Sequence, residues 1–364
     1  MSERAEAPRL DRRKALLGVL GAIILAVAAT TLVGLAADFD EVLAALRRAD
    51  RRWFPLCLAG LACAYTGYIL GYREIARMHN GPQLRLPTIA HTVGIGFGAN
   101  VLGSSAGGLA VDLWALHRAG LGLHNSARRV LGFNTLEWAL LGTFAAASGA
   151  VVLAAYPDAA PRGMALGWLS GVTAAVAAAT LVTSPKGLRR FLDVPEDDEE
   201  PATGNRLRWL WGKARKGFAD VVGGVLIARH LHTNPRRHPA AVLGFTVYWF
   251  GHLLTLWAAL RAFPGNTQLL LPTLVLAFAT GYAATALPLP GGGSGGIEAA
   301  LAFSLNAVGV PLASALLAAL VYRFFTFWLP LIPALALTAG IGRLDSELEA
   351  VAARDAPRED TATA

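Results

Sequence analysis

Two glycine-rich interruptions inside long apolar stretches constrain the fold of this chain more than any other feature. The first runs from Gly96 to Gly120 (GFGANVLGSSAGGLAVDLWALHRAG), and the second from Thr285 to Gly309 (TALPLPGGGSGGIEAALAFSLNAVG). A segment in lipid has to be helical, because lipid offers no partner to a bare backbone N–H or C=O. A break by Gly and Pro is tolerated only where the loose backbone is buried in protein or lines a wet cavity. Paired breaks therefore indicate a transporter-type site near the middle of a bilayer.

The composition places the chain in a membrane. Apolar residues make up 54% and charged residues 16% of the 364 residues, whereas a soluble domain carries about 25% charged residues. The formal net charge of +7 does not indicate nucleic-acid binding, because the Lys and Arg residues lie at segment ends and in one loop. Basic residues there set cytoplasmic orientation and contact anionic lipid headgroups. We expect an all-α, polytopic membrane helical bundle in the cell (plasma) membrane.

The apolar stretches are long enough for about eight transmembrane segments, since a straight span needs about 20 residues. The first broken stretch fits either a re-entrant hairpin or a span with a kinked continuation, and the second is long enough for one full span plus a half-helix. A transmembrane domain over 15–341 is expected after a cytoplasmic N-terminus at 1–14. The eight segments are 15–37, 53–76, 88–116 (broken), 127–155, 163–183, 240–262, 268–308 (broken) and 311–341.

The polar stretches suggest the orientation. Asp38–Arg52 has apolar residues at helical spacing and predicts a short amphipathic helix. The most basic segments, the N-terminus and the loop at 184–239, belong in the cytoplasm. That loop predicts an aromatic and basic helix that lies on lipid headgroups or packs on the bundle. Four Arg residues at 47–52 then lie outside, against the positive-inside rule. The tail at 342–364 is polar and is expected to be disordered.

An internal repeat relates the two breaks. A shift of 189 residues aligns them without a gap: it pairs Ser105 with Ser294 and Gly120 with Gly309. Each half then contains a break, a short helix, a Gly turn and a long helix. With the expected topology the halves enter from opposite sides, as inverted repeats do.

Four charged residues fall within or beside apolar runs: Asp112, Glu137, Glu298 and Arg323. At mid-bilayer each costs about 2.5–3.5 kcal/mol on insertion scales, which requires a partner or a wet cavity. Glu298 and Arg323 are placed to pair across neighbouring helices. The short helices after the glycines have free N–H groups at their starts, which attract anions. Alternatively, the glycines serve only close helix packing.

The chain offers no catalytic site with its partners, so we do not expect an enzyme, a cofactor or a metal. Gly292–Gly296 satisfies G-x-S-x-G around Ser294, but a serine nucleophile needs a base. The last histidine, His252, lies upstream of Ser294, and no strand precedes the serine as a hydrolase elbow requires.

The second half resembles the signature of the lysylphosphatidylglycerol synthase transmembrane-region family, also called flippase-like or UPF0104 proteins. The matching residues are Pro288, Pro290, Gly291 to Gly293, Glu298, Gly309, Tyr322, Arg323 and Trp328. The first half departs from the family pattern, with Ser104 or Ser105 at the break, Leu109 at the acidic position and Asp112 near the Arg position. The resemblance implies about eight helices with re-entrant elements, and lipid translocation. The aminoacyl-transferase domain of the synthases does not fit into the residues after 341, so synthase activity is not expected.

We therefore expect a lipid translocase (flippase-like) that handles or binds an anionic or isoprenoid-linked membrane lipid. One alternative is an ion- or proton-coupled carrier of a small solute with Glu298 as the proton site. Another is a non-transporting partner of an envelope-lipid synthesis enzyme. Arg118 flanks the first break, where it either binds lipid phosphate or only sets orientation. The candidate substrate-binding residues are Asp112, Arg118, Asn134, Glu137, Pro290, Gly293, Ser294, Glu298, Tyr322 and Arg323.

Overall fold

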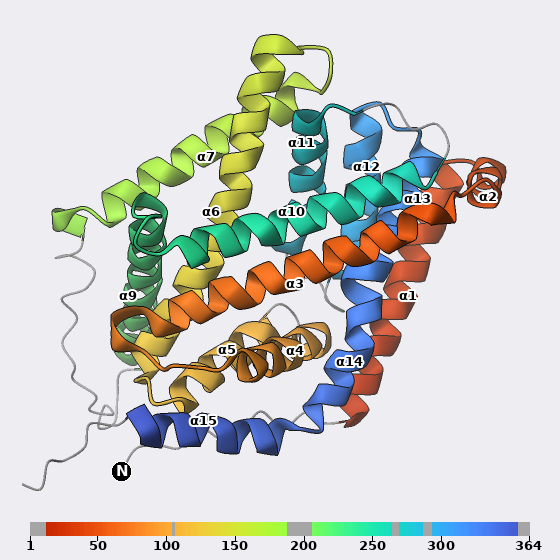
Figure 1. Ribbon diagram of the computed structural model, residues 1–364. Coiled ribbons are helices and arrows are strands. Elements are labelled where there is room, and N and C mark those ends of the chain that lie inside the picture. Colours follow the sequence, from red (N-terminus) through yellow and green to blue (C-terminus); the bar gives the residue numbers. More distant parts are fainter. Residues whose placement is uncertain (1–11, 104–105, 188–205, 264–268, 287–292, 356–364) are drawn as a thin grey trace, which may run out of the picture.

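The computed structural model describes residues 12–103, 106–187, 206–263, 269–286 and 293–355, and all regular elements in these ranges are helices (Figure 1). Within these ranges, six helical stretches are long and apolar enough to cross a membrane. The expected all-α, polytopic membrane bundle is thereby confirmed. The six stretches are Leu17–Ala36, Arg51–Asn80, Leu123–Ala155, Arg162–Val182, Pro239–Arg261 and Leu312–Thr338.

The helices follow the expected segments closely. They are α1 (Arg12–Ala36), α2 (Phe39–Arg47), α3 (Phe54–Arg77), α4 (Leu86–Gly103), α5 (Ala106–Arg118), α6 (Leu123–Ala155), α7 (Arg162–Val182), α9 (Arg206–Thr233), α10 (Pro239–Arg261), α11 (Leu271–Tyr282), α12 (Gly296–Ala307), α13 (Leu312–Arg323), a π-helical turn (Phe324–Trp328), α14 (Leu329–Thr338) and α15 (Ile341–Asp355). The predicted amphipathic helix after the first span is α2, whose start is capped by the Asp38 carboxylate.

Two long helices, α3 and α10, run side by side across the middle of the bundle (Figure 1). Glycines set their separation. A β-carbon on Gly67 would lie 2.3 Å from the Gly244 carbonyl oxygen, and one on Gly251 would lie 2.5 Å from the Gly60 carbonyl oxygen. Small residues let helix backbones approach closely in membranes, where packing and hydrogen bonds replace the hydrophobic effect as the force between helices.

Both broken stretches are helical hairpins. In the first, α5 folds back on α4 so closely that a β-carbon on Gly107 would lie 2.2 Å from the Ala99 carbonyl oxygen. Of the two expected arrangements, the re-entrant hairpin is therefore correct. In the second, α12 packs on α11 at Gly281, where a β-carbon would lie 2.7 Å from the Leu301 Cα.

Among the described residues of 268–308, where the sequence predicts a full span, the longest apolar helical run is Leu271–Ala286, which falls short of membrane-spanning length. The helices α11 and α12 have 12 residues each, about 18 Å at 1.5 Å per residue, which is too short to cross the hydrocarbon core of about 30 Å. The apolar run is long enough, but α11 passes into a 3₁₀ turn over Ala283–Ala286. The Pro- and Gly-rich run that follows in the sequence is unsuited to extending a helix.

The repeat register predicted from the sequence is confirmed by helix boundaries. The shift of 189 residues carries the end of α5 at Arg118 onto the end of α12 at Ala307, and the start of α6 onto the start of α13. The equivalent Gly120 and Gly309 both have a left-handed φ, at 99° and 94°. In Figure 1, α5 lies in the lower half and α12 in the upper half, and α6 rises through the view whereas α13 and α14 descend. The halves therefore run in opposite directions, as in an inverted repeat.

The basic helix of the 184–239 loop packs on the bundle. Its second half, in α9, contacts the start of α6: a β-carbon on Gly132 would lie 2.9 Å from the Ile227 side chain. Asp220 joins the same two helices by accepting hydrogen bonds from Arg128 Nε at 3.1 Å and His124 Nδ1 at 2.9 Å. Packing on the bundle, one of the two expected arrangements, is thus observed for this half of α9.

The tail is ordered further than expected. The helix α15 covers Ile341–Asp355 and so includes residues 342–355, which we expected in a disordered tail because they are polar; residues 356–364 lie outside the described part of the chain. The prediction of disorder from polarity failed because α15 is amphipathic and buries only one of its faces. Leu344 and Leu348 are fully buried one turn apart, so the helix lies with one face against the bundle.

Candidate functional site

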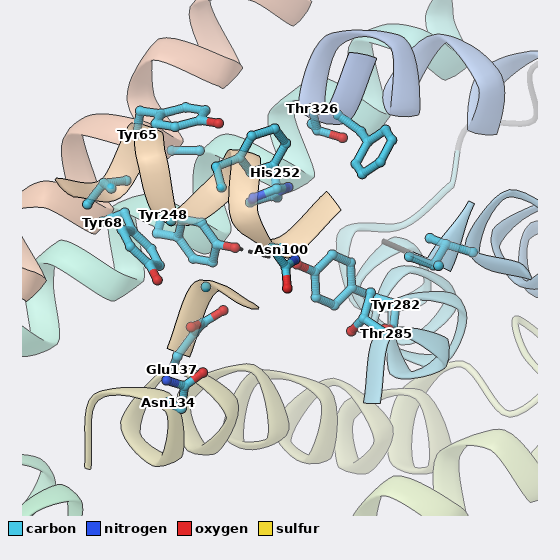
Figure 2. Close-up of a pocket in the computed structure, with 18 of the residues that line it drawn as sticks. Tyr65, Tyr68, Asn100, Asn134, Glu137, Tyr248, His252, Tyr282, Thr285 and Thr326 are labelled. Carbon is cyan, nitrogen blue, oxygen red and sulfur yellow. Dashed lines mark hydrogen bonds between the residues drawn. The ribbon is translucent and has the colours of Figure 1, made fainter. Parts of the chain in front are cut away.

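A polar cavity of about 400 Å³ lies inside the bundle, between the two repeats (Figure 2). Its wall combines residues of α3, α4, α5, α6, α10, α11, α12 and α13, together with the 3₁₀ turn after α11 and the π-helical turn after α13. Figure 2 shows the hydroxyl groups of Tyr248 and Tyr282 and the carboxylate of Glu137 facing the same central space, with Asn134 beside Glu137. The glycine-rich breaks thus line a cavity, as the sequence predicted.

The two repeats contribute equivalent positions to this wall. The repeat shift pairs Asn134 with Arg323 and Glu137 with Thr326, and all four residues line the cavity. The cavity therefore lies where the halves meet, which is where repeat-built transporters hold their substrates. The chemistry of the equivalent positions differs, so the two halves of the wall carry different charge.

In the second half, Arg323 and Glu298 form a buried ion pair. Arg323 Nε lies 3.2 Å from Glu298 Oε1, and their side chains are 7% and 0% exposed. The other carboxylate oxygen accepts the Gly295 N–H at 2.7 Å and so caps the start of α12. The Arg323 guanidinium lies over the Phe327 ring, 4.1 Å from its centroid. The predicted pairing is thus observed, and the anion at this helix start is the protein's own carboxylate.

Glu298 is not part of the cavity wall, whereas Arg323 is. Glu298 therefore positions Arg323 rather than facing a ligand directly. Beside Arg323, the Tyr322 hydroxyl lies 2.6 Å from His252 Nδ1, and both of these residues also line the cavity.

In the first half, two carboxylates face the cavity. Asp112 is 6% and Glu137 is 7% exposed, and no salt bridge among the described residues includes either one. The backbone carbonyl of Glu137 accepts a hydrogen bond from Trp249 Nε1 at 2.9 Å. Burial of a carboxylate without a cation is costly, so these side chains mark a wet or ligand-binding surface.

Tyrosines form much of the remaining wall, and reasoning from charged residues alone missed them. Tyr65, Tyr68, Tyr248 and Tyr282 line the cavity, and the hydroxyl groups of Tyr248 and Tyr282 lie 3.5 Å apart. The sequence does indicate one pair of these tyrosines. Tyr65 and Tyr68 are three residues apart, so they share one face of a helix.

Of the ten candidate residues, the cavity brings six together: Asp112, Asn134, Glu137, Gly293, Tyr322 and Arg323. Ser294 is buried without lining it, and Pro290 lies outside the described residues.

Arg118 does not line the cavity but joins α5 to α15. Its guanidinium lies 2.5 Å from Asp345 Oδ1 and 2.8 Å from Glu349 Oε1. The hydrogen bond from Arg118 holds the pKa of the Asp345 carboxyl below its ordinary value. Arg118 thus has a structural role that the sequence did not predict.

Comparison with known proteins identifies the family of the chain. No match was found among curated proteins. The model of one family, described as the lysylphosphatidylglycerol synthase TM region, matches residues 19–334, nearly the whole of the helical bundle. Together with the six membrane-spanning helices, this match shows that the chain is a multi-pass membrane protein of the lysylphosphatidylglycerol synthase transmembrane-region family.

Proposed function

We propose that this protein binds the headgroup of a membrane lipid in the central cavity and moves it across the bilayer. The observation that carries the proposal is the position of the cavity, inside a membrane bundle and between two inverted repeats that supply equivalent wall residues. Such repeats allow a central site to be reached from either side, when one half moves against the other.

The size and polarity of the cavity support a headgroup as the ligand. A volume of about 400 Å³ is within the range of about 300–1,000 Å³ that is common for small-molecule sites. The wall contains five buried or half-buried tyrosines, two carboxylates and Arg323. Burying these polar groups at membrane depth costs free energy unless a polar ligand or water binds them. The acyl chains would remain in the surrounding lipid.

The proposal includes an orientation in the cell membrane. The end that carries the start of α1 and the helix α15 would face the cytoplasm, because α1 follows directly on the basic N-terminal segment of the sequence and basic segments favour the cytoplasmic side. Labelling of single cysteines placed in α15 and at Asp158 by a membrane-impermeant reagent in intact cells tests this. Only the cysteine at position 158 should react.

Lipid movement is tested in proteoliposomes that contain lipids with a fluorophore on one acyl chain, so that the headgroup is unmodified. Dithionite added outside bleaches only the outer leaflet, about half of the signal, unless the protein brings inner lipids out. The panel includes phosphatidylglycerol, phosphatidylethanolamine and a polyprenyl phosphate. We expect bleaching beyond the outer-leaflet fraction for at least one of these lipids.

A pair of glycine variants separates the cavity from general leakage. Gly108 lines the cavity, so Gly108→Trp should fill it and stop lipid movement. Gly163 has open space around it, and Gly163→Trp should leave the rate unchanged. If folded wild-type protein moves no lipid of the panel, or if both variants behave alike, the proposal is wrong.

An ion-coupled carrier of a small solute is a second candidate, favoured by the two carboxylates of the first half. Because Glu298 is held by Arg323 and does not line the cavity, Asp112 and Glu137 are better placed for coupling than Glu298. Solute uptake driven by a pH gradient, and lost in Glu137→Gln, would support this candidate. The non-transporting partner of an envelope-lipid enzyme stays a prediction.

A further inference from the structure

We propose that α15 is a latch that holds the two repeats in the observed arrangement and thereby slows the movement of lipid through the central cavity. This inference rests on the proposed function and concerns its regulation. The helix begins at Ile341, after residue 334, where the family match ends. The latch therefore lies outside the region that this chain shares with the family.

The helix α15 is joined covalently to one repeat and by side-chain contacts to the other. It follows α14, the last helix of the second repeat, and it packs on α4 and α5, the re-entrant hairpin of the first repeat. Figure 1 shows α15 beneath α4 and α5 at the lower end of the view. A connection of this kind resists any movement of one repeat against the other.

A cluster of ion pairs attaches α15 to the end of α5. The guanidinium of Arg118, the last residue of α5, donates to both carboxylate oxygens of Asp345 and lies 2.8 Å from Glu349 Oε1. Asp345 and Glu349 are four residues apart, so both lie on one face of α15. The two-pronged contact with Asp345 also fixes the orientation of the guanidinium. One arginine thus determines where α5 meets α15.

The same helix is attached to the start of α4. The Thr88 hydroxyl donates a hydrogen bond to Glu347 Oε2 at 3.1 Å. Just before α4, the Gln83 N–H donates to Asp355 Oδ2 at 3.2 Å, and the Gln83 carbonyl accepts from Arg354 Nη2 at 3.1 Å. Both helices of the first hairpin are therefore attached to a single helix that continues from the second repeat.

The attachment can open while the bundle stays folded. The Arg118 side chain is 19% exposed and that of Glu349 is 52% exposed. Ion pairs that water reaches are individually weak and are screened by salt. Contacts with these properties belong to the part of a structure that opens locally without global unfolding. These features suit a contact that breaks and re-forms.

The helices beneath the latch form one side of the cavity. Gly108 and Asp112 of α5 and Asn100 of α4 line it, and Asp112 lies only six residues before Arg118 on the same helix. Lipid movement through a site between inverted repeats requires one half to move against the other. The contacts of α15 with the hairpin have to break or shift during that movement, so their strength limits its rate.

The dithionite assay in proteoliposomes tests the latch with any lipid of the panel that the wild-type protein moves. Arg118→Ala should move that lipid at least three times faster. The double variant Asp345→Asn, Glu349→Gln should give the same increase, and adding Arg118→Ala to it should give no more, because both changes remove the same contacts. Arg343→Ala is the matched control and should keep the wild-type rate, since its ion pair with Glu347 lies within α15.

A covalent link tests the same contact in the opposite direction. Arg118→Cys and Glu349→Cys are combined in a protein whose Cys57 and Cys63 are replaced by Ala, and a short bismaleimide joins the two new thiols. The unlinked protein should move lipid faster than wild type, and the linked protein should be at least tenfold slower than the unlinked one. Each single-cysteine variant, treated with the same reagent, should keep its untreated rate.

Pulsed electron paramagnetic resonance measures the arrangement of the repeats without lipid transport. Spin labels are attached to Leu123→Cys in the first repeat and Ile332→Cys in the second, both at exposed positions, in the same cysteine background. Arg118→Ala should add a second distance population to the wild-type one. Thermal unfolding in detergent verifies folding, and the double variant Asp345→Asn, Glu349→Gln replaces Arg118→Ala if the latter does not fold.

The outcomes separate the latch from the proposed function. A rate of lipid movement that is unchanged or lower in folded Arg118→Ala would overturn the latch and leave lipid transport in place. An identical distance distribution in wild type and Arg118→Ala would also overturn it. A second distance population without lipid movement in any variant would overturn the proposed function and support α15 as the contact that holds the repeats together.

Discussion

Replacing Glu298 by Gln removes the negative charge from the ion pair that positions Arg323 while leaving the volume nearly unchanged. The Gln carbonyl oxygen can still accept the Gly295 N–H that Glu298 accepts at 2.7 Å, but its NH₂ group cannot accept from Arg323. The guanidinium is 7% exposed and would remain buried beside a neutral partner. The local fold of α12 should survive, so the decrease in the free energy of unfolding reports the interaction between the two charges.

The structure gives the size of this loss. At the Nε–Oε1 separation of 3.2 Å and an effective dielectric constant near 20, two unit charges attract by about 5 kcal/mol. Removal of one partner of a buried pair costs about 3–5 kcal/mol, because the other charge stays uncompensated. We therefore expect Glu298→Gln to lower the free energy of unfolding by about 3–5 kcal/mol.

The assay is reversible unfolding in mixed micelles of mild detergent and sodium dodecyl sulfate. It includes Arg323→Gln and the double variant as a double-mutant cycle. The double variant should lose less stability than the sum of the two single variants, since it leaves no lone charge. A loss below about 1 kcal/mol for Glu298→Gln, typical of an exposed pair, would refute the reasoning. Strict additivity of the two single variants would refute it equally.

Three further predictions concern the scaffold. Gly67→Ala should destabilise the protein by more than about 2 kcal/mol through overpacking of α3 on α10. The new β-carbon would lie 2.3 Å from the Gly244 carbonyl oxygen. Gly163→Ala is the control in the same unfolding assay, because Gly163 has open space around it. Arg118→Ala should release α15, and limited proteolysis after Arg343 should then be faster than in wild-type protein. Arg118 lowers the pKa of Asp345 from 3.8. The ion pair therefore stabilises the attachment of α15 fully above pH 4, and this stabilisation is lost as the pH falls through the lowered pKa. Digestion with an acid-active protease should show that wild-type α15 becomes protease-sensitive only in that acidic range. Protease sensitivity of α15 that is the same in Arg118→Ala and wild type would contradict both α15 predictions.

Much of the architecture is visible in the sequence because the membrane imposes strict rules. Every apolar run has to form a helix, and the lengths of the runs place the spans to within a few residues. The repeat was predictable for a related reason. Gly120 and Gly309 occupy the same turn in both halves and both adopt a left-handed φ, a conformation that favours glycine.

Other features depend on contacts that no periodicity encodes. Residues 341–355 look polar because α15 is solvated on one face, and its attachment depends on Arg118, which is 227 residues away from Asp345 in the sequence. The length of the run at 268–308 suggested a full span, whereas the structure divides it into two short helices.

The candidate site was predictable only in part. Charges at membrane depth identified Asp112, Glu137 and Arg323 because their burial is costly anywhere but in a cavity or a pair. The tyrosines of α3, α10 and α11 were missed, since aromatic residues are common in any membrane helix. Which carboxylate faces the cavity also depends on packing: Glu298 turns toward Gly295 and Arg323, whereas Glu137 remains in the wall.

The central claim is that the cavity between the repeats holds a lipid headgroup, and photocrosslinking tests it most directly. A phospholipid with a diazirine on its headgroup is incubated with the protein in nanodiscs, illuminated, and located by peptide mass spectrometry. The account predicts adducts on cavity residues such as Glu137 and Tyr248, which unlabelled lipid should displace. Adducts confined to the outer surface of α7, where Val176 is 60% exposed, with no cavity residue labelled, would contradict it.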